Sequence, residues 1–471
     1  GKACASPVLR ALSQVNKALG LGGAAAASSA PSKVGPGLLS PLAGATPAWE
    51  GGRARDTVAA SSYHHHAGPD RGLGRAGGFA SGGDGWKGVD RRGQTILRQL
   101  NSASSSALEE NQCSLGGFPV VPYVDVEGLI GEEKNCLTER IRHIVQAELP
   151  SLARVAEYFF QPGVEGKRVR SSALLLLASS LSESDAAAQS EITTRVDLSP
   201  YNQFPEEVRR RQQRIAEITE MIHVASLLHD DVLDDAETRR GLTTVNKMFG
   251  DKVAILAGDF LLARASVALA ALKNTEVVGL IATCIENLAT GEMMQSRGTR
   301  DERLSLDYYY RKTFLKTASL LANSCKSVAV LGEHGDEAAQ LAYDYGYHVG
   351  MAFQLTDDVL DFVGSSTTLG KPTLSDLKSG IATGPVLFAI EEEPQLVDLT
   401  LRKFKYEGDV EMAARLVAKT DGVKKTIEMA ENHARLAIKA VECFPQAASK
   451  HAEACRDALR FLAQSVTSRQ K

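Results

Sequence analysis

Apolar residues recur three and four positions apart through most of the chain beyond about residue 120, in segments separated by short Gly, Pro and Asp breaks. Since an α-helix has 3.6 residues per turn, this spacing places the apolar side chains on one helix face. Strand-like alternation is scarce, and Ala and Leu favour closely packed helices. The clearest segments are Leu137–Ala147, Val169–Leu181, Ile215–Leu233, Val253–Leu272, Val277–Met294, Leu315–Leu331, Ala338–Phe362, Val423–Val441 and Ala452–Leu462. The pattern predicts an all-α fold, a single large helical bundle.

Two stretches lack this periodicity. Residues 1–115 are rich in Ala, Gly and Ser and show no sustained helical or strand period. Such a composition buries too little apolar surface to offset the conformational entropy lost on folding. We therefore expect a disordered leader over 1–115 and the all-α domain over 116–471. The polar, Pro-containing stretch Ser182–Glu206 is predicted to be a loop inserted between two core helices.

Charge separates the same two regions. Residues 1–100 hold twelve Lys or Arg and five Asp or Glu, whereas the remainder holds 41 basic and 52 acidic residues. The basic start is typical of an organelle transit peptide, and we expect a mitochondrial location with the plastid as the alternative. The mildly acidic body gives no reason to expect a nucleic-acid partner. The seven scattered cysteines form no CxxC pair and are expected to be free thiols.

Two acidic motifs interrupt the apolar periodicity. The first is Asp230-Asp231-Val232-Leu233-Asp234, and the second is Asp357-Asp358-Val359-Leu360-Asp361. On a helix, the first and last Asp of each motif lie one turn apart on one face, where like charges repel by roughly a few tenths of a kcal/mol. Asp is also a poor helix former. Because both motifs are unfavourable for stability, we interpret them as carboxylate clusters that face a strongly cationic group.

Basic residues precede and follow the first motif. Lys167 and Arg170 lie where a helix begins after Pro162-Gly163, and the free N–H groups of a helix start favour an anion such as phosphate. His223 lies two turns before Asp230 and therefore on nearly the same face. Arg239-Arg240 follow the carboxylates directly. Carboxylates beside basic residues indicate a phosphorylated substrate bridged to the protein through Mg²⁺, which prefers oxygen ligands.

In this order the motifs resemble the trans-isoprenyl diphosphate synthase family, the head-to-tail polyprenyl synthases. The resemblance runs from about Tyr123 to the C-terminus, and it departs at Glu165, where the family often has a glycine. The resemblance implies an isoprenoid synthase-like bundle around a central cavity. It implies isopentenyl diphosphate binding by Lys167, Arg170, His223 and Arg240. It implies allylic diphosphate binding by Arg239, Lys316, Thr317, Gln354, Lys371 and Lys378.

The same resemblance implies a metal-dependent reaction. The expected ligands are Asp230, Asp231, Asp234, Asp357, Asp358 and Asp361, holding about two to three Mg²⁺ ions per site, with Mn²⁺ as a substitute. The expected catalytic set is Asp230, Asp231, Asp234, Arg239, Lys316, Asp357 and Asp358. The substrates would be isopentenyl diphosphate and farnesyl or geranylgeranyl diphosphate. The family also suggests a homodimer or a heteromer with a related subunit, and peripheral membrane association for product release.

Small residues precede the first motif and bear on product length. Ser226 and Ala225, four and five residues before Asp230, should line the tunnel into which the product grows. Ile222 lies one turn further on. Since small residues there leave the tunnel open about one turn below the carboxylates, we expect a product of about forty to fifty carbons. Such a product is suited to a ubiquinone side chain.

Three alternatives differ in testable features. A short-chain synthase making geranylgeranyl diphosphate would share every motif but release a shorter product. A terpene cyclase would normally carry one aspartate motif and an aromatic-rich pocket, whereas this chain has two motifs and only 6% aromatic residues. A catalytically silent regulatory subunit would be expected to lose an aspartate motif, and both are intact here.

Overall fold

The computed structural model describes residues 121–145, Val155, Tyr158, and residues 168–182, 208–239, 241–363 and 374–469. The chain divides into two units at Gly116, and all described residues belong to Gly117–Lys471. The predictions for the leader and for the insertion beyond Ser182 fall outside the described residues, as do Lys167, Arg240 and Lys371. The domain boundary at residue 115 therefore stays a prediction.

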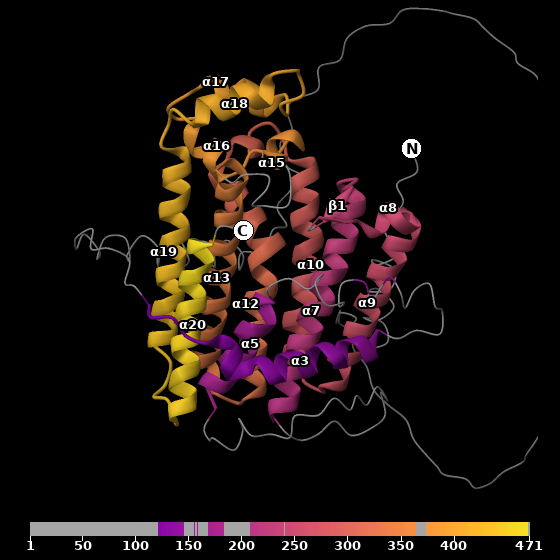
Figure 1. Ribbon diagram of the computed structural model, residues 1–471, viewed down its shortest axis with the longest axis vertical. Helices are drawn as coiled ribbons and strands as arrows, with labels where there is room; N and C mark the ends of the chain where they lie inside the picture. The colour runs from indigo at the N-terminus through magenta and orange to yellow at the C-terminus, as the bar shows by residue number, and fades with distance from the viewer. Residues whose placement is uncertain are drawn as a thin grey trace, which may run out of the picture. The chain divides into compact units, whose positions relative to one another are not determined.

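The all-α prediction is confirmed, since helices make up most of the described chain (Figure 1). The longer helices are α3 (Val126–Ile144), α5 (Val169–Ser180), α7 (Val208–Leu233), α9 (Asp251–Ala271), α10 (Thr275–Arg297), α12 (Ser319–Leu331), α13 (Gly335–Val363), α19 (Gly422–Glu442) and α20 (Lys450–Ser468). Most of them run lengthwise side by side, and α3 crosses them at one end (Figure 1). The long helices therefore form one bundle, and α3 lies across one of its two ends.

Shorter elements connect these helices, and those within residues 375–417 lie at the other end of the bundle (Figure 1). They are β1 (Thr238–Arg239), β2 (Leu242–Thr243), α8 (Val245–Phe249), η1 (Glu302–Leu304), α11 (Leu306–Thr313), η2 (Phe314–Ala318), α15 (Ser375–Lys378), α16 (Gly384–Ala389), α17 (Gln395–Leu401) and α18 (Asp409–Val417). The antiparallel pair β1–β2 pairs Thr238 with Thr243 and turns through Gly241, whose φ is 78°. This hairpin follows α7 at once and was not expected from the sequence.

The sequence places the starts of two helices several residues too late, because buried charged residues that pair with one another interrupt the apolar pattern of the helix faces. The sequence pattern starts the helices at Leu137 and Ile215, whereas α3 and α7 start at Val126 and Val208. In the early part of α7, Arg209 is buried and donates to Glu133 of α3 at 2.8 and 2.6 Å. Glu133 lies in the early part of α3, before Leu137, and is itself buried. A search for apolar periodicity does not count such buried polar residues.

Two glycines one turn apart set the distance between α12 and α13. A Cβ on Gly346 would lie 2.7 Å from the Leu321 carbonyl oxygen, and one on Gly350 would lie 2.6 Å from Cα of Ala318. These distances are below van der Waals contact, so only glycine permits this close approach of the two backbones. The packing fixes the second acidic motif on α13 relative to η2, which precedes α12.

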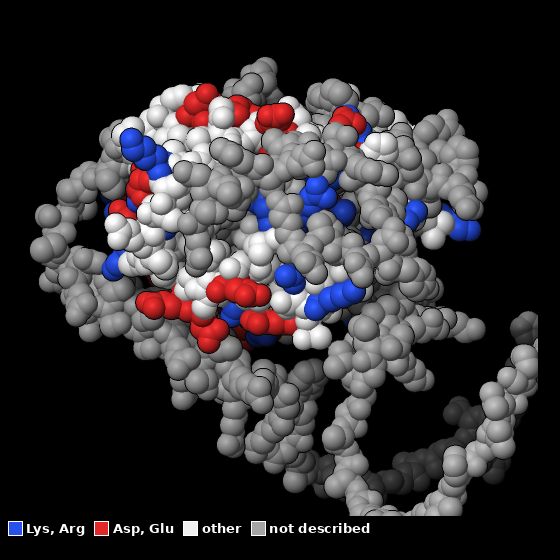
Figure 2. Space-filling view, turned by 90° about the horizontal axis from the view of Figure 1, so that it is seen from below, with Lys and Arg blue, Asp and Glu red and all other residues white. Residues whose placement is uncertain are grey.

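The outer surface differs from one face to another. On the face seen from below, acidic and basic side chains lie interspersed (Figure 2). Elsewhere, α9 and α10 are long and apolar enough to cross a membrane, judged by length and composition alone. In their most apolar 18-residue stretches, 33% and 22% of the residues are buried inside the protein. Ile255, Leu256 and Val267 of α9 are among the exposed large apolar residues.

A buried histidine pair joins the long helices α13 and α19. Nδ1 of His348 lies 2.8 Å from Nδ1 of His433, and the rings of Tyr310 and Tyr347 pack beside His433. Burial, together with the neighbouring His433, lowers the pKa of His348 to about 3. Burial lowers the pKa of His433 to about 4. Both imidazoles are therefore neutral at physiological pH.

Acid should weaken this interface. Unfolded histidine has a pKa of about 6.5, so below that pH the unfolded chain binds protons that the folded protein excludes. Stability should then fall from about pH 6.5 towards pH 4, by roughly 1 kcal/mol per pH unit for each histidine. The urea midpoint of the His433→Gln variant should vary less with pH than that of wild type, whereas His451→Gln on α20 should match wild type. Equal pH dependence in all three proteins would contradict this assignment.

Candidate active site

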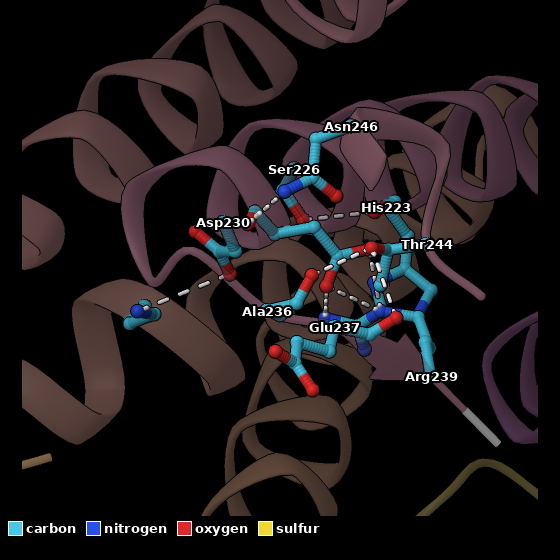
Figure 3. A network of polar contacts seen from close by, with 10 residues as sticks. His223, Ser226, Asp230, Ala236, Glu237, Arg239, Thr244 and Asn246 are labelled. Carbon is cyan, nitrogen blue, oxygen red and sulfur yellow. Dashed lines mark hydrogen bonds and ion pairs between the residues drawn. The ribbon is translucent and has the colours of Figure 1, made fainter. Parts of the chain in front are cut away.

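The first acidic motif lies at the end of α7, and its three carboxylates have different surroundings. Asp231 is 2% exposed and accepts hydrogen bonds from Arg239, from Nε at 3.0 Å and from Nη2 at 2.8 Å. The β1–β2 hairpin turns Arg239 back towards the end of α7 (Figure 3). Asp230 is partly exposed and Asp234 is exposed. Asp231 thus holds Arg239, whereas Asp230 and Asp234 remain on the open side.

Lys316 and Glu292 complete the cluster around Asp230. Lys316 lies on η2, a π-helical turn between α11 and α12, and such turns are frequent at functional sites. Its Nζ lies 3.9 Å from Asp230 and forms an ion pair with Glu292 of α10. Burial acts to lower the pKa of Lys316, but Asp230 and Glu292 raise it overall. The lysine is therefore firmly protonated and shared between carboxylates.

The carboxylates of this cluster outnumber its cations. Burial raises the pKa of Asp230 to about 6, and the opposing effect of Lys316 is offset by Glu292 and Asp234. Burial also raises the pKa of Asp234, with Lys316 opposing the shift and Glu292 adding to it. A raised carboxyl pKa means that the ionised form lacks stabilising positive charge. A bound cation would supply that charge.

The second motif, at the end of α13, also divides its carboxylates. Asp358 is 2% exposed and accepts hydrogen bonds from the Tyr309 hydroxyl at 2.5 Å and from Gln354 Nε2 at 2.8 Å. Asp361 is fully buried and accepts from the N–H groups of Ser375 and Asp376 and from the Ser375 hydroxyl. Asp361 therefore fixes the start of α15, the helix that ends at Lys378. The oxygens of Asp358 and Asp361 are thus hydrogen-bonded within the protein.

Asp357 is the carboxylate of this motif that faces outwards, with 39% of its side chain exposed. Arg469, near the C-terminus, forms an ion pair with Asp357 at 2.8 Å. The Arg469 guanidinium also lies 3.7 Å from the centre of the Phe353 ring. The last turn of the chain is thereby tied to the second motif.

The two motifs are linked through the helical stretch of α11 and η2. Lys316 contacts the first motif, while Lys312, one turn earlier, lies close to Asp358 and Asp376. Thr317 donates to Gln354 Oε1 at 2.9 Å, and Gln354 in turn donates to Asp358. One continuous segment therefore supplies cations and hydrogen bonds to both motifs.

A separate basic cluster lies beside the second motif. Nη1 of Arg170, on α5, lies 3.1 Å from Nε2 of His223, on α7, which fits a neutral imidazole that accepts from the guanidinium. Arg170 also lies 5.9 Å from the centre of the Phe353 ring that Arg469 contacts. The structure therefore brings together Arg170 and His223, which the sequence assigned to one diphosphate site.

The residues predicted to set product length lie on α7 below Asp230. Ala225 and Ile222 are buried, at 0% and 1% exposure. Ser226 is partly exposed, and its hydroxyl donates to the His223 carbonyl oxygen. Their placement one and two turns below the carboxylate agrees with the helical register predicted from the sequence.

The sequence missed Glu292, Tyr309, Lys312 and Arg469, all of which contact predicted site residues. Lys312 had a signal, because it lies four residues before Lys316 and so on the same helix face. Tyr309, seven residues before Lys316, had the same signal. Glu292 and Arg469 are distant in sequence from every motif, and their roles depend on tertiary packing.

The donor set fits Mg²⁺. Among the described residues, no group of three or more His, Cys, Asp or Glu side chains could hold a metal ion by itself. Mg²⁺ typically uses one or two carboxylates together with substrate phosphates and water. Asp230 and Asp234 on one side, and Asp357, which is also paired with Arg469, on the other provide that number of solvent-accessible carboxylates, with basic residues nearby for phosphates. Zn²⁺ would prefer His or Cys ligands.

Comparison with known proteins agrees with this geometry. Residues 149–417 match the Polyprenyl synthetase family. A mitochondrial solanesyl-diphosphate synthase 1 from Oryza sativa is 50% identical over 343 residues, which cover 73% of this chain and 78% of that protein. A probable mitochondrial hexaprenyl pyrophosphate synthase from Neurospora crassa is 42% identical, covering 74% of this chain and 83% of that protein.

Solved structures show the same fold. The apo form of an Arabidopsis medium/long-chain length prenyl pyrophosphate synthase has a TM-score of 0.59 and 42% identity, covering 74% of this chain and 100% of that one. A polyprenyl synthase from Caulobacter crescentus, complexed with calcium and isoprenyl diphosphate, has a TM-score of 0.61 and 28% identity, covering 74% of this chain and 100% of that one. The terpene cyclase alternative is thereby excluded. From its two aspartate motifs, its fold and these relatives, the chain belongs to the polyprenyl synthetase family and is a prenyltransferase.

Proposed function

We propose that the protein is a long-chain all-trans polyprenyl diphosphate synthase that adds isopentenyl diphosphate repeatedly to an allylic diphosphate. The observation that carries the proposal is the pairing of two carboxylate clusters, at Asp230 and Asp357, with one lysine-bearing segment between them. The product, of about forty to fifty carbons, would supply a ubiquinone side chain, since the tunnel residues one turn below Asp230 are small. The relatives named as solanesyl diphosphate synthases support this length.

For the metal we propose a narrower ligand set than the sequence suggested. Asp230, Asp234 and Asp357 would hold Mg²⁺, because their carboxylates lie on the open side of the two motifs. Asp231, Asp358 and Asp361 would instead position the motifs, since hydrogen bonds already engage their oxygens. The bound metal would stabilise the negative charge that builds on the departing diphosphate.

The protein's own cations would share that task. Lys316 and Arg239 lie beside the first motif, and Lys378 is the last residue of α15, which Asp361 anchors. Fixed positive groups aimed at a developing charge lower the barrier without reorganisation. Thr317 and Gln354 would orient the allylic diphosphate from the second motif. Lys371 belongs to the same proposed set.

Isopentenyl diphosphate would bind at the basic cluster beside the second motif. Arg170 and His223 are in contact there, and Lys167 and Arg240 are proposed to complete the site. Arginine binds phosphate through parallel N–H groups, which fixes the orientation of the substrate. The nucleophilic double bond would then face the allylic carbon, and buried apolar helix faces would exclude water from the cation.

Location and partner complete the proposal. The relatives named as mitochondrial agree with the location predicted from the leader, and one Arabidopsis relative is named both chloroplastic and mitochondrial. We propose that a second copy of this chain covers the exposed apolar residues of α9 and α10, where Leu256 is 50% and Met293 51% exposed. Exposed large apolar residues such as these are costly to leave in contact with water.

The product length can be tested directly. Purified chain with Mg²⁺, isopentenyl diphosphate and farnesyl diphosphate should yield products of about forty to fifty carbons, because Ala225 leaves space one turn below the carboxylates. Ala225→Phe should shorten the product to about fifteen to twenty carbons and Ala225→Val to an intermediate length, as judged by chromatography of the dephosphorylated products. The KM for isopentenyl diphosphate should stay within about twofold, since Ala225 itself belongs to neither diphosphate site.

Three outcomes would contradict this account. Wild-type products of twenty carbons or fewer would support the short-chain alternative. Absence of elongation by the purified chain, with elongation restored by a related subunit, would support the regulatory alternative. An unchanged product length in the Ala225→Phe variant would reject the tunnel assignment.

The partner surface makes an independent prediction. Leu256→Glu combined with Val267→Glu should convert a dimer into a monomer in light scattering, because burying two unpaired charges at an interface costs several kcal/mol. Tyr406→Glu serves as the control, since Tyr406 is 69% exposed and lies between α17 and α18, away from α9. A monomeric wild type, or a dimer that survives the double substitution, would reject this surface.

A further inference from the structure

A cavity of about 50 Å³ lies at the end of the bundle covered by the short helices. Its wall is formed by the end of α10, by η1 and α11, and by residues 380–403. The polar groups of the wall include Arg303, Ser305, Lys312, Gly380, Thr400 and Lys403. The cavity is several times larger than one water requires. No described residue that we assign to the metal or to either substrate diphosphate lines it.

The cavity wall carries more positive than negative charge. Arg303, Lys312 and Lys403 line it, against the single carboxylate of Glu302. That carboxylate accepts a hydrogen bond from the Thr299 N–H at 2.8 Å. Among the described residues, neither Arg303 nor Lys403 forms an ion pair. Burial lowers the pKa of Lys403, and the neighbouring charges of Arg303 and Lys405 lower it further. The positive charges of Arg303 and Lys403 thus repel each other.

Thr400 provides an independent sign of a missing ligand. It lines the cavity and is 2% exposed, yet its hydroxyl oxygen has no hydrogen-bond partner in the structure. Leaving a buried hydroxyl unpaired costs about 1–3 kcal/mol. A polar group bound in the cavity would remove that cost.

The local backbone conformation places Lys403 at the cavity wall. Lys403 and Phe404 both adopt positive φ, at 56° and 49°, although neither is glycine. Lys403 packs on Gly380, where an added Cβ would lie 3.0 Å from the Lys403 Cβ. Gly380 itself has a φ of 78°, which disfavours any larger residue. The position of Lys403 is therefore defined by two local backbone features.

We propose that this cavity binds a phosphate-type anion, as a further anion site distinct from the two substrate sites. Arg303 and Lys403 would supply charge-assisted hydrogen bonds, and Thr400 would donate its hydroxyl. The cavity adjoins the second acidic motif, because Tyr309 and Lys312 line it while Tyr309 donates to Asp358. Two sources share this chemistry: free orthophosphate, and the inorganic diphosphate that the reaction releases. The second source rests on the proposed function.

Calorimetric titration with orthophosphate, in EDTA and without isoprenoid substrates, tests the site. Wild type should bind the anion, and Arg303→Ala/Lys403→Ala should raise the Kd at least about tenfold, because two charged donors are lost. Lys316→Ala, which removes a cation from the proposed allylic site, should leave the Kd within about twofold. No binding by wild type, an unchanged Kd in the double variant, or an equal loss in Lys316→Ala would overturn the proposal.

A matched pair of threonine variants tests the hydroxyl. Thr400→Val should raise the Kd about threefold or more without destabilising the protein, since the lost hydroxyl has no partner in the structure. Thr383→Val is the control, because Thr383 is also buried with an unpartnered oxygen but does not line the cavity. Equal Kd values for the two variants would place the anion away from Thr400 and contradict the assignment.

A diphosphate titration distinguishes the two sources. If diphosphate binds the cavity with a lower Kd than orthophosphate, the diphosphate released by the reaction is the ligand. If orthophosphate binds with the lower Kd, free phosphate is the ligand. Because this titration uses neither Mg²⁺ nor isoprenoid substrates, its failure leaves the product assay of the proposed function unaffected.

Discussion

The structure depends on the repulsion between carboxylates at the ends of two long helices. Asp230 and Asp234 lie together with Glu292, and burial with like charge raises the pKa of both aspartates. Lys316 offsets part of this repulsion, but it is shared among the acids and cannot neutralise them all. The folded protein therefore keeps an unbalanced negative site that a divalent cation with a diphosphate would complete. The repulsion between these carboxylates reduces the folding stability of the protein but favours the binding of a cation.

The surrounding fold supports this site at several points. Gly346 and Gly350 let α12 and α13 approach closely, so η2 lies beside the second motif. The π-helical turn of η2 then places Lys316 and Thr317 towards different motifs. Arg469 adds the C-terminal turn to the same assembly through Asp357. Residues far apart in sequence thus converge because helix packing, and not local sequence, positions them.

Most of the fold and the locations of the motifs could be predicted from the sequence. The helices with continuous apolar faces were found, whereas the start of α7 was missed because Arg209 is buried through its pairing with Glu133. Within the site, the two motifs look alike in sequence, yet their carboxylates differ in role. Asp231 and Asp361 could not be separated from Asp230 and Asp357 by spacing, since their partners, Arg239 and the start of α15, are set by tertiary structure.

The division of each motif into open and internally bonded carboxylates is the central claim, and counting bound metal ions tests it most directly. The measurement is the number of Mn²⁺ ions bound per chain, by electron paramagnetic resonance, in the presence of an unreactive allylic thiodiphosphate. Folded Asp230→Asn and Asp357→Asn variants should each bind at least one ion fewer than wild type, whereas Asp361→Asn should bind the wild-type number. An equal loss of ions in Asp361→Asn and Asp357→Asn would contradict the account.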